Sequence, residues 1–265
     1  MKHIVQATDH PRTKDTLKED LRRLGITQGM TIIVHSSLSS LGWVNGGSVA
    51  VVQALMETVT EEGTIVMPSQ SVDLSDPSEW GNPAVPKEWW ETIRETMPAY
   101  DPAHTPTSGM GQIVETFRTY SSVRRSSHPM YSFAAWGKDS EDLLRDHPLE
   151  FSLGENSPLE RLYKKHAFVL LLGVGFGNNT SFHLAEYRIP YRNVIQKGSP
   201  VMDAGKRVWK TYKELEFREE LFEKIGEAFI EAKGIKAEKI GSALAYFFSM
   251  PKAVDFAETY LKALQ

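Results

Sequence analysis

The chain has 265 residues, of which 41% are hydrophobic and 24% charged, so disordered, collagen-like and coiled-coil proteins are excluded and the core needs no disulfide or metal. The formal net charge of −4 gives no basic field for a phosphate backbone, which argues against a nucleic-acid-binding protein and favours a small or cationic partner. Cysteine is absent, so a thiol nucleophile, a Cys-ligated metal and a disulfide framework are excluded.

The first elements in chain order predict a parallel βαβ unit. Leucines at helical spacing follow Thr13 and predict an opening helix, after which residues 31–35 are rich in β-formers and predict a strand. A second helix, capped by Ser48, precedes a short buried strand at 64–67. Two strands joined by a helix of about three turns predict a parallel pair with a right-handed crossover, so we expect an α/β sheet.

The segment from 68 to 108 is rich in proline. Prolines at 68, 77, 83, 86, 98, 102 and 106 leave room for one regular element, a helix over about 86–96 with Pro86 in its first turn. A loop of this length inside a compact domain is usually functional.

The second half of the chain alternates helices with strands. The segment 167–173 is the most apolar and is predicted to be a central strand. The other expected elements are helices at about 109–118, 139–146 and 158–165, a hairpin of 193–201 with 206–211, a helix at 215–233, a strand at 241–247 and a closing helix after Pro251. Because no repeat, low-complexity tract or linker divides the sequence, residues 1–265 are predicted to form a single domain.

A loop rich in hydroxyl groups and glycine lies between the first strand and the second helix. It reads HSSLSSLGWVNGGS and runs from His35 to Ser48. Successive backbone N–H groups, serine hydroxyls and the helix N-terminus can bind a phosphate there. The alternative is a connecting loop with a capped helix, and the loop lacks the Gly-Lys-Ser/Thr ending of a Walker motif.

A glycine-rich turn, Gly173–Gly177, follows the apolar strand. Its spacing fails the dinucleotide-binding pattern because Asn178 stands where a third glycine is required, and Asn193 stands where an acidic residue would bind a ribose. A tight turn that lets the backbone approach a ligand explains these glycines better.

A candidate acid–base pair follows this turn. His183 and Glu186 are three residues apart, so they share one face of a short helix that Asn179 or Thr180 can cap. A carboxylate beside an imidazole fixes its tautomer and stabilises its protonated form, as a general base near neutral pH requires. The spacing alone is weak, because the segment 147–150 (HPLE) shares it and is predicted to be a surface turn.

Acidic and aromatic residues of the proline-rich segment form a further candidate site. Asp73, Asp76, Asp101 and the pair Trp89–Trp90 could line a cleft for a polyamine or an amino sugar. The alternative is that the acids are solvated in exposed loops and that the tryptophans belong to the core.

Together these segments resemble the antibiotic N-acetyltransferase family, whose best-known members are aminoglycoside 3-N-acetyltransferases. The matches span nearly the whole chain, and their common order is more specific than any one of them. They are HSSLSSLGWVNGG (35–47), TIVMPSQS (64–71), DPSEWGNPAVPKEWW (76–90), YDPAHTPTSGMGQIVETFR (100–118), RRSSHPMYSFAAWG (124–137) and GVGFGNNTSFHLAE (173–186).

The fold that the resemblance implies is a single-domain three-layer α/β/α sandwich around a mixed sheet. It differs from the common acetyltransferase (GNAT) fold, whose R/Q-x-x-G-x-G/A pyrophosphate loop is absent from the sequence. The N-terminus has no apolar stretch before its charges, and the longest apolar run, Phe168–Leu172, is far shorter than the ~20 residues that span a bilayer. We therefore expect a cytoplasmic protein with no membrane or nucleic-acid partner, and a homodimer is left open.

The resemblance also assigns roles to residues of this chain. His183 and Glu186 would be the catalytic pair, and no metal is required. Acetyl-CoA would be bound by the serine-rich loop and a nearby turn, through His35, Ser36, Ser37, Leu38, Gly42, Trp43, Val44, Ser108, Met110 and Gly111. The substrate would contact Asp73, Glu79, Trp90 and Thr180.

The activity that the resemblance implies is acetyl transfer to the 3-amino group of the 2-deoxystreptamine ring of aminoglycosides. His183 would deprotonate the amine, which then attacks the thioester directly in a ternary complex, since no cysteine can carry the acetyl group. Thr180 or loop amides would stabilise the oxyanion. Acetylation of another small amine, including an aminophosphonate, and a non-catalytic CoA- or nucleotide-binding protein stay open, whereas an oxidoreductase rests on the glycine turn alone.

Overall fold

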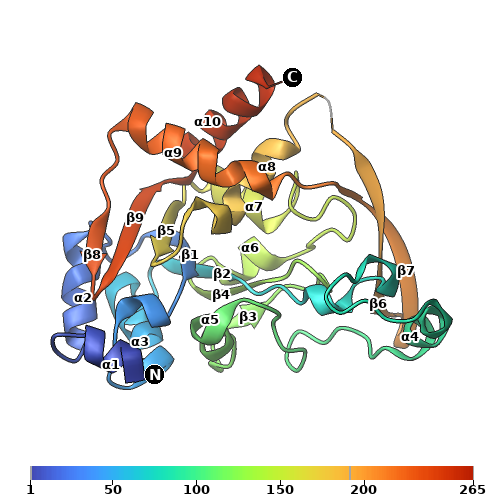
Figure 1. The fold of residues 1–265 in the computed structure, drawn as a ribbon, viewed down its shortest axis with the longest axis horizontal. Coiled ribbons are helices and arrows are strands. Elements are labelled where there is room, and N and C mark those ends of the chain that lie inside the picture. Colours follow the sequence, from blue (N-terminus) through green and yellow to red (C-terminus); the bar gives the residue numbers. More distant parts are fainter. Residues whose placement is uncertain (1, 191, 265) are drawn as a thin grey trace.

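A seven-stranded mixed sheet forms the centre of the computed structural model, which describes residues 2–190 and 192–264 (Figure 1). Its strands lie in the order β3-β4-β2-β1-β5-β9-β8, and β1 pairs in parallel with both β2 and β5. The strand bounds are β1 Thr31–Ser36, β2 Thr64–Pro68, β3 Arg124–Arg125, β4 Phe133–Gly137, β5 Phe168–Leu172, β8 Glu238–Ile240 and β9 Ala243–Ser249. A long antiparallel hairpin of β6 (Val194–Asp203) and β7 (Lys206–Leu215) forms a second sheet.

Helices cover both faces of the central sheet because alternate strand residues point to opposite sides. In β1, Ile32 and Val34 pack with α2, α3 and α5, whereas Ile33 packs with α6 to α10. Figure 1 shows α9 and α10 on one side of the sheet and α2 and α3 on the other, which confirms the three-layer α/β/α prediction. The helix bounds are α1 Lys2–Ala7, α2 Lys14–Arg23, α3 Gly47–Val59, α4 Trp90–Thr96, α5 Gly111–Arg118, α6 Ser140–Leu144, α7 Pro158–Lys164, α8 His183–Glu186, α9 Phe222–Lys233 and α10 Met250–Ala263.

The predicted βαβ unit is present as β1, α3 and β2, and β5 is the central strand expected from its apolar sequence. The predicted cap of α3 is wrong. The helix begins after Gly46, whose φ of 85° is left-handed, and the Ser48 hydroxyl lies 2.7 Å from the Thr116 hydroxyl instead of capping the helix. In the described ranges, no helix has the length and apolar character needed to cross a membrane.

Two parts of the second half differ from the predicted elements. The strand β7 continues to Leu215 and α9 begins at Phe222, where the sequence predicted one helix from 215. The inward positions of this strand include Tyr212 and Glu214, which are buried although neither is aliphatic, so hydrophobic alternation did not reveal them. The strands β3 and β4 were not predicted.

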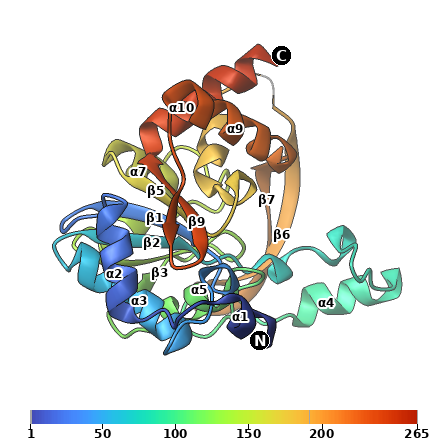
Figure 2. The same ribbon diagram turned by 60° about the vertical axis from the view of Figure 1, so that its left-hand side comes forward.

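The proline-rich segment forms an arm that projects from the body, with α4 near its end (Figure 2). None of the α4 residues is buried, and the helix follows a 3-10 turn at Lys87–Trp89. Arg94 of α4 donates two hydrogen bonds to the Asp76 carboxylate, at 2.8 and 2.7 Å, which closes the arm on itself. The Asp76 carboxylate therefore binds a cation of its own arm and does not line the cleft for which the sequence proposed it.

The packing of α9 against the turn after β5 makes a stability prediction. A Cβ atom at Gly226 would lie 1.9 Å from Cγ of Phe176, so alanine there must displace the phenylalanine ring. We expect Gly226→Ala to lower the free energy of unfolding by about 1–3 kcal/mol in urea denaturation, as overpacking does. The exposed neighbour Glu227 provides the control, since Glu227→Ala should change it by less than about 0.5 kcal/mol. Equal stabilities of the two variants would contradict this packing.

Candidate active site

A cavity of about 200 Å³, here called the central cavity, lies at the carboxyl ends of β1, β2 and β5. Its lining includes Val34, His35 and Ser36 of β1, and Pro68 at the end of β2. Within the sheet, β1 lies between β2 and β5, so the chain continues from β1 to the neighbour on one edge and later returns to the neighbour on the other edge. Open α/β sheets bind ligands at such a reversal of strand order, so the position of this cavity is that of a ligand site.

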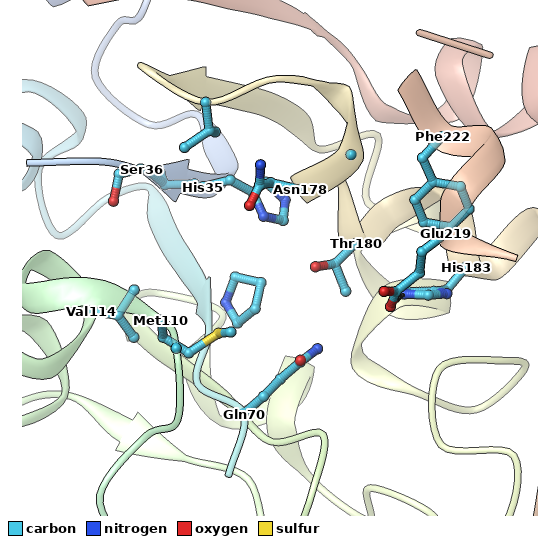
Figure 3. Close-up of a pocket in the computed structure, with 15 residues that line it drawn as sticks. His35, Ser36, Gln70, Met110, Val114, Asn178, Thr180, His183, Glu219 and Phe222 are labelled. Atoms are coloured by element: carbon cyan, nitrogen blue, oxygen red, sulfur yellow. Dashed lines mark ion pairs between the residues drawn. The ribbon is translucent and has the colours of Figure 1, made fainter. Parts of the chain in front are cut away.

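His183 lines this cavity beside Glu219 (Figure 3), and a second carboxylate, that of Glu186, contacts its other ring nitrogen. Its side chain is 4% exposed, and its Nδ1 lies 2.7 Å from Oε2 of Glu186. Its Nε2 lies 3.2 Å from Oε1 of Glu219, and its ring packs on Phe217 with the centroids 4.2 Å apart. The hydrogen bond to Glu186 was expected from the spacing, whereas the contact with Glu219 was not.

The two carboxylates differ in burial and in their hydrogen bonds. Glu186 is buried, and its second oxygen accepts a hydrogen bond of 2.6 Å from the backbone N–H of Arg218, so its orientation is fixed from both sides. The Glu219 side chain is 63% exposed and can turn away from His183 without leaving a buried charge behind. The imidazole thus has one fixed partner and one exchangeable partner.

These contacts set the protonation of His183. Burial alone would lower the pKa of His183, but hydrogen bonds to Glu186 and Glu219 outweigh it and raise the pKa to about 9. The hydrogen bond from His183 lowers the pKa of Glu219 below its ordinary value. At neutral pH the imidazole therefore carries a proton, and it becomes a base only when that proton is lost. Movement of Glu219 away from the ring would favour that loss.

The glycine turn before α8 allows the chain to pass close to the serine-rich loop. Gly173 has a φ of 72°, and a Cβ atom there would lie 2.7 Å from Cβ of Ser40. Asn179 caps the following 3-10 turn by accepting hydrogen bonds from the N–H and hydroxyl of Ser181, at 3.3 and 2.7 Å. Of the two predicted caps Asn179 is therefore the observed one, and Thr180 lines the central cavity.

A buried carboxylate anchors the segment that leads to Glu219. Glu214 is fully buried and accepts hydrogen bonds from the N–H and hydroxyl of Ser152, at 3.0 and 2.6 Å, and from the Tyr187 hydroxyl. Tyr187 follows α8 directly. A buried carboxylate without hydrogen-bond partners would be very costly, so these hydrogen bonds must form when the protein folds. They fix β7 against Ser152 and against Tyr187, which lies next to α8 and so near His183.

A groove of about 600 Å³, here called the serine-loop groove, adjoins the central cavity. The two share five lining residues, namely Ser36, Gly109, Met110, Val174 and Asn178. Of the residues predicted to bind CoA, the groove is lined by Ser36, Ser37, Leu38, Gly42, Trp43, Val44, Met110 and Gly111.

Two of the residues predicted to bind CoA lie outside the serine-loop groove, and one residue that lines the groove was not predicted. His35 lines the central cavity only, and Ser108 lines neither space but donates its N–H to the Gln70 carbonyl at 2.8 Å. The hydroxyls of Ser37 and Ser40 lie 3.0 Å apart, so they bond within the loop. Ile4 of α1 adds an apolar wall to the groove.

A third space of about 550 Å³, here called the 72–85 cleft, lies at the base of the arm. Asp73 and Glu79 line it as predicted, but Glu79 forms an ion pair with Lys197, which also lines the cleft. Trp80 rather than Trp90 supplies the tryptophan. The ring of Trp90 instead faces cations of its own arm, Lys87 and Arg94.

The 72–85 cleft is separated from His183 by two aromatic rings. Tyr131 lines the cleft, and its ring centroid is 5.6 Å from that of Phe217, which packs on His183. Asp101 does not line the cleft and accepts hydrogen bonds from the N–H groups of Ala103 and His104 in its own loop. Among the described residues, no group of three or more His, Asp or Glu side chains is arranged to hold a metal ion.

Comparisons with known proteins identify the family that the chain resembles. The family profile described as aminoglycoside 3-N-acetyltransferase matches residues 33–262. The SPbeta prophage-derived aminoglycoside N(3')-acetyltransferase-like protein YokD of Bacillus subtilis is 62% identical over 261 residues, which cover 98% of this chain and 96% of YokD. The crystal structure of YokD superposes with a TM-score of 0.97 at 62% identity, over 98% of this chain and 97% of the YokD chain.

Two ligand complexes are also similar to this chain. The binary complex of AAC-IIIb with CoASH has a TM-score of 0.86 at 28% identity, over 96% of this chain and 98% of its own. AAC-VIa bound to sisomicin has a TM-score of 0.87 at 29% identity, over 97% of this chain and 99% of its own.

The contacts of His183 with Glu186 and Glu219 predict the pH at which its imidazole loses a proton. Histidine NMR of the unliganded protein should give an apparent pKa of about 9 for His183, and Glu219→Gln should lower it because an amide does not stabilise the imidazolium. The stabilisation from this raised pKa is present below the ordinary pKa of 6.5 and is lost as the pH rises through about 9. Glu220→Gln is the control, since the Glu220 carboxylate contacts Arg218 and no contact joins it to His183. An unchanged titration in Glu219→Gln would contradict the pairing.

Proposed function

The chain belongs to the aminoglycoside 3-N-acetyltransferase family, and on that premise we propose that it transfers the acetyl group of acetyl-CoA to the 3-amino group of an aminoglycoside. We propose further that residues 1–265 act as one acetyltransferase domain. The observation that carries this function is a buried His183–Glu186 pair in a cavity that adjoins the serine-loop groove. The CoASH complex of AAC-IIIb and the sisomicin complex of AAC-VIa support the two substrates.

In this proposal acetyl-CoA lies along the serine-loop groove. Trp43 and Val44 offer apolar surface to the pantetheine arm. At Gly47 a Cβ atom would meet nothing within 4 Å, so the backbone there admits close approach of the phosphates. The five residues shared with the central cavity mark where the thioester would pass from one space into the other. The acetyl group then stands beside His183.

The reaction requires an amine without its proton. An aminoglycoside amine is largely protonated at neutral pH, and the exposed carboxylate of Glu219 can exchange its bond with His183 for one with the incoming ammonium group. His183 then loses one of the two anions that raise its pKa and can accept the amine proton. Glu186, held by the Arg218 N–H, keeps Nδ1 protonated and leaves Nε2 as the basic atom.

The transfer itself is direct. The ammonium group and the His183 imidazolium each first release one proton to water. The neutral amine nitrogen then attacks the thioester carbonyl carbon, His183 takes the N–H proton that the nitrogen loses as the C–N bond forms, and the C–S bond breaks to release CoA as a thiolate. The chain has no cysteine to carry the acetyl group, so both substrates are bound at once in this proposal.

The acceptor would extend from the central cavity toward the 72–85 cleft. One chain segment borders both spaces, since Gln70 lines the cavity and Val72 and Asp73 line the cleft. The rings of Tyr131 and Phe217 lie between the cleft and His183, so the acceptor would pass beside them. Asp73 and Glu79 attract a polycation, but Lys197 neutralises one of these charges. That ion pair favours a second candidate, an acetyltransferase whose acceptor is a small amine of lower positive charge.

The catalytic assignment predicts a loss of turnover without a loss of coenzyme binding. His183→Ala should reduce acetyl transfer by about 10²–10⁴-fold, the usual contribution of a general base. Its acetyl-CoA affinity by calorimetry should stay nearly unchanged, because His183 does not line the serine-loop groove. His104→Ala, at a side chain 86% exposed, is the control. Full turnover in His183→Ala would refute its role, and acetyl-CoA binding by the wild type without turnover of any amine would favour a non-catalytic binding protein.

The acceptor assignment predicts a charge-dependent KM. Asp73→Asn should raise the aminoglycoside KM more than it lowers kcat, since it removes binding common to the ground and transition states, and salt should weaken apparent affinity. Asp101→Asn is the matched control because Asp101 lines none of the three spaces. A thiol-release assay over aminoglycosides and simpler amines gives the readout. Release with simpler amines alone would retain the acetyltransferase and reject the aminoglycoside.

A further inference from the structure

Two buried polar atoms in the central cavity have no hydrogen-bond partner. They are Nε2 of His35 and the hydroxyl oxygen of Ser36, at the carboxyl end of β1. His35 is 7% exposed and lines the central cavity. A buried polar atom without a partner costs about 1–3 kcal/mol, so such atoms in a ligand cavity are typical of groups that a bound ligand completes.

Strand alternation separates the roles of these two residues. Ile33 packs with the helices α6 to α10, so His35, two residues further on, faces the same side of the sheet as His183 of α8. Ser36 faces the opposite side and lines both the cavity and the serine-loop groove. Figure 3 shows His35 and Asn178 at one side of the cavity, with His183 and Glu219 at the other and Thr180 between them in this view.

The two histidines of the cavity also differ in charge. Burial lowers the pKa of His35 to about 3, with a further contribution from His183, whereas the pKa of His183 is raised to about 9. His35 is therefore uncharged at neutral pH and does not compete with His183 as a base. A neutral imidazole with its hydrogen on Nε2 is a hydrogen-bond donor that adds no positive charge against a cationic substrate.

We propose that the imidazole of His35 donates a hydrogen bond from Nε2 to the carbonyl oxygen of the acetyl thioester and holds the oxyanion of the tetrahedral intermediate. The inference rests on the proposed acetyl transfer and identifies the donor that this reaction needs. As the C–N bond forms, the carbonyl π electrons move to the oxygen, which accepts the His35 hydrogen bond. When they return, the C–S bond breaks, CoA leaves as the thiolate, and His35 ends the step neutral because the amine proton has gone to His183.

The experiment uses infrared spectroscopy of acetyl-CoA labelled with ¹³C at the carbonyl and bound to the full-length protein. In the wild type the carbonyl band should lie at a lower wavenumber than in free acetyl-CoA, and His35→Leu should remove that shift. The variant should bind acetyl-CoA with nearly unchanged affinity and lose about 10²–10³-fold in kcat, as removal of one oxyanion donor does. His35→Gln, whose side-chain amide can donate a hydrogen bond, should retain part of the band shift and part of kcat. His104→Leu, at an exposed position, is the control.

A measurement on the wild type alone keeps the inference testable if His35→Leu fails to fold. Because His35 is neutral throughout, the band shift should persist from pH 6 to pH 10, across the titration of His183. A shift that disappears as His183 titrates would assign the donor to the His183 imidazolium and overturn the inference. A band unchanged by His35→Leu, or abolished by Ser36→Ala in its place, would overturn it too.

The infrared result and the turnover assay test the hydrogen bond of His35 and the proposed acetyl transfer separately. If the carbonyl band shifts and depends on His35 but no amine releases CoA, the hydrogen bond stands and the acetyltransferase assignment falls. If acetyl-CoA does not bind to the wild type, both fall together.

Discussion

The hydrogen bond between His183 and Glu186 is the interaction on which the rest of the site depends. It is buried, 2.7 Å long and held from behind by the N–H of Arg218. An imidazole in such a position would ordinarily lose its proton to burial, and the carboxylates reverse this outcome. Neighbouring residues hold this pair in place. Phe217 packs on the imidazole ring, and the hydrogen bonds of Glu214 fix the end of β7, after which Phe217 and Arg218 follow in sequence.

Sheet topology brings three separate stretches of chain to this pair. The strands β1, β2 and β5 run parallel, so their carboxyl ends meet at one edge and deliver the serine-rich loop, the start of the arm and the glycine turn to the same place. The groove and the cavity share Ser36 of the serine-rich loop, Val174 and Asn178 at the glycine turn, and Gly109 and Met110 before α5, which lets one bound molecule occupy both. In the proposed reaction this continuity brings the thioester to the base without any rearrangement of the sheet.

The sequence predicted the parts of the site that depend on local pattern. Residues three apart on a helix share a face in any context, so His183 and Glu186 could be paired without a structure. The apolar strand β5 and the loop after β1 were also found, because periodicity and glycine content are local signals. Family resemblance added the residues proposed to bind CoA, and the structure brings eight of them to the lining of one groove.

The remaining features depend on tertiary contacts that no local pattern encodes. Glu219 lies among similar acids at 216 and 220, and only the path of β7 brings it to Nε2 of His183. Trp90 was chosen for the cleft over Trp80, although its ring turns toward cations of its own arm. The side of the sheet that His35 faces follows from strand alternation, but the helix opposite it is known only from the fold.

In the proposed reaction His183 must be neutral before it can accept the proton of the acceptor amine. The most direct measurement is the pH dependence of kcat/KM for an acceptor whose own amine pKa lies well below 7, so that the amine does not titrate in the range of the enzyme. If His183 is the base, kcat/KM should rise with pH with an apparent pKa of about 9, the value for His183 in the free protein. A rate independent of pH between 7 and 10 would contradict it.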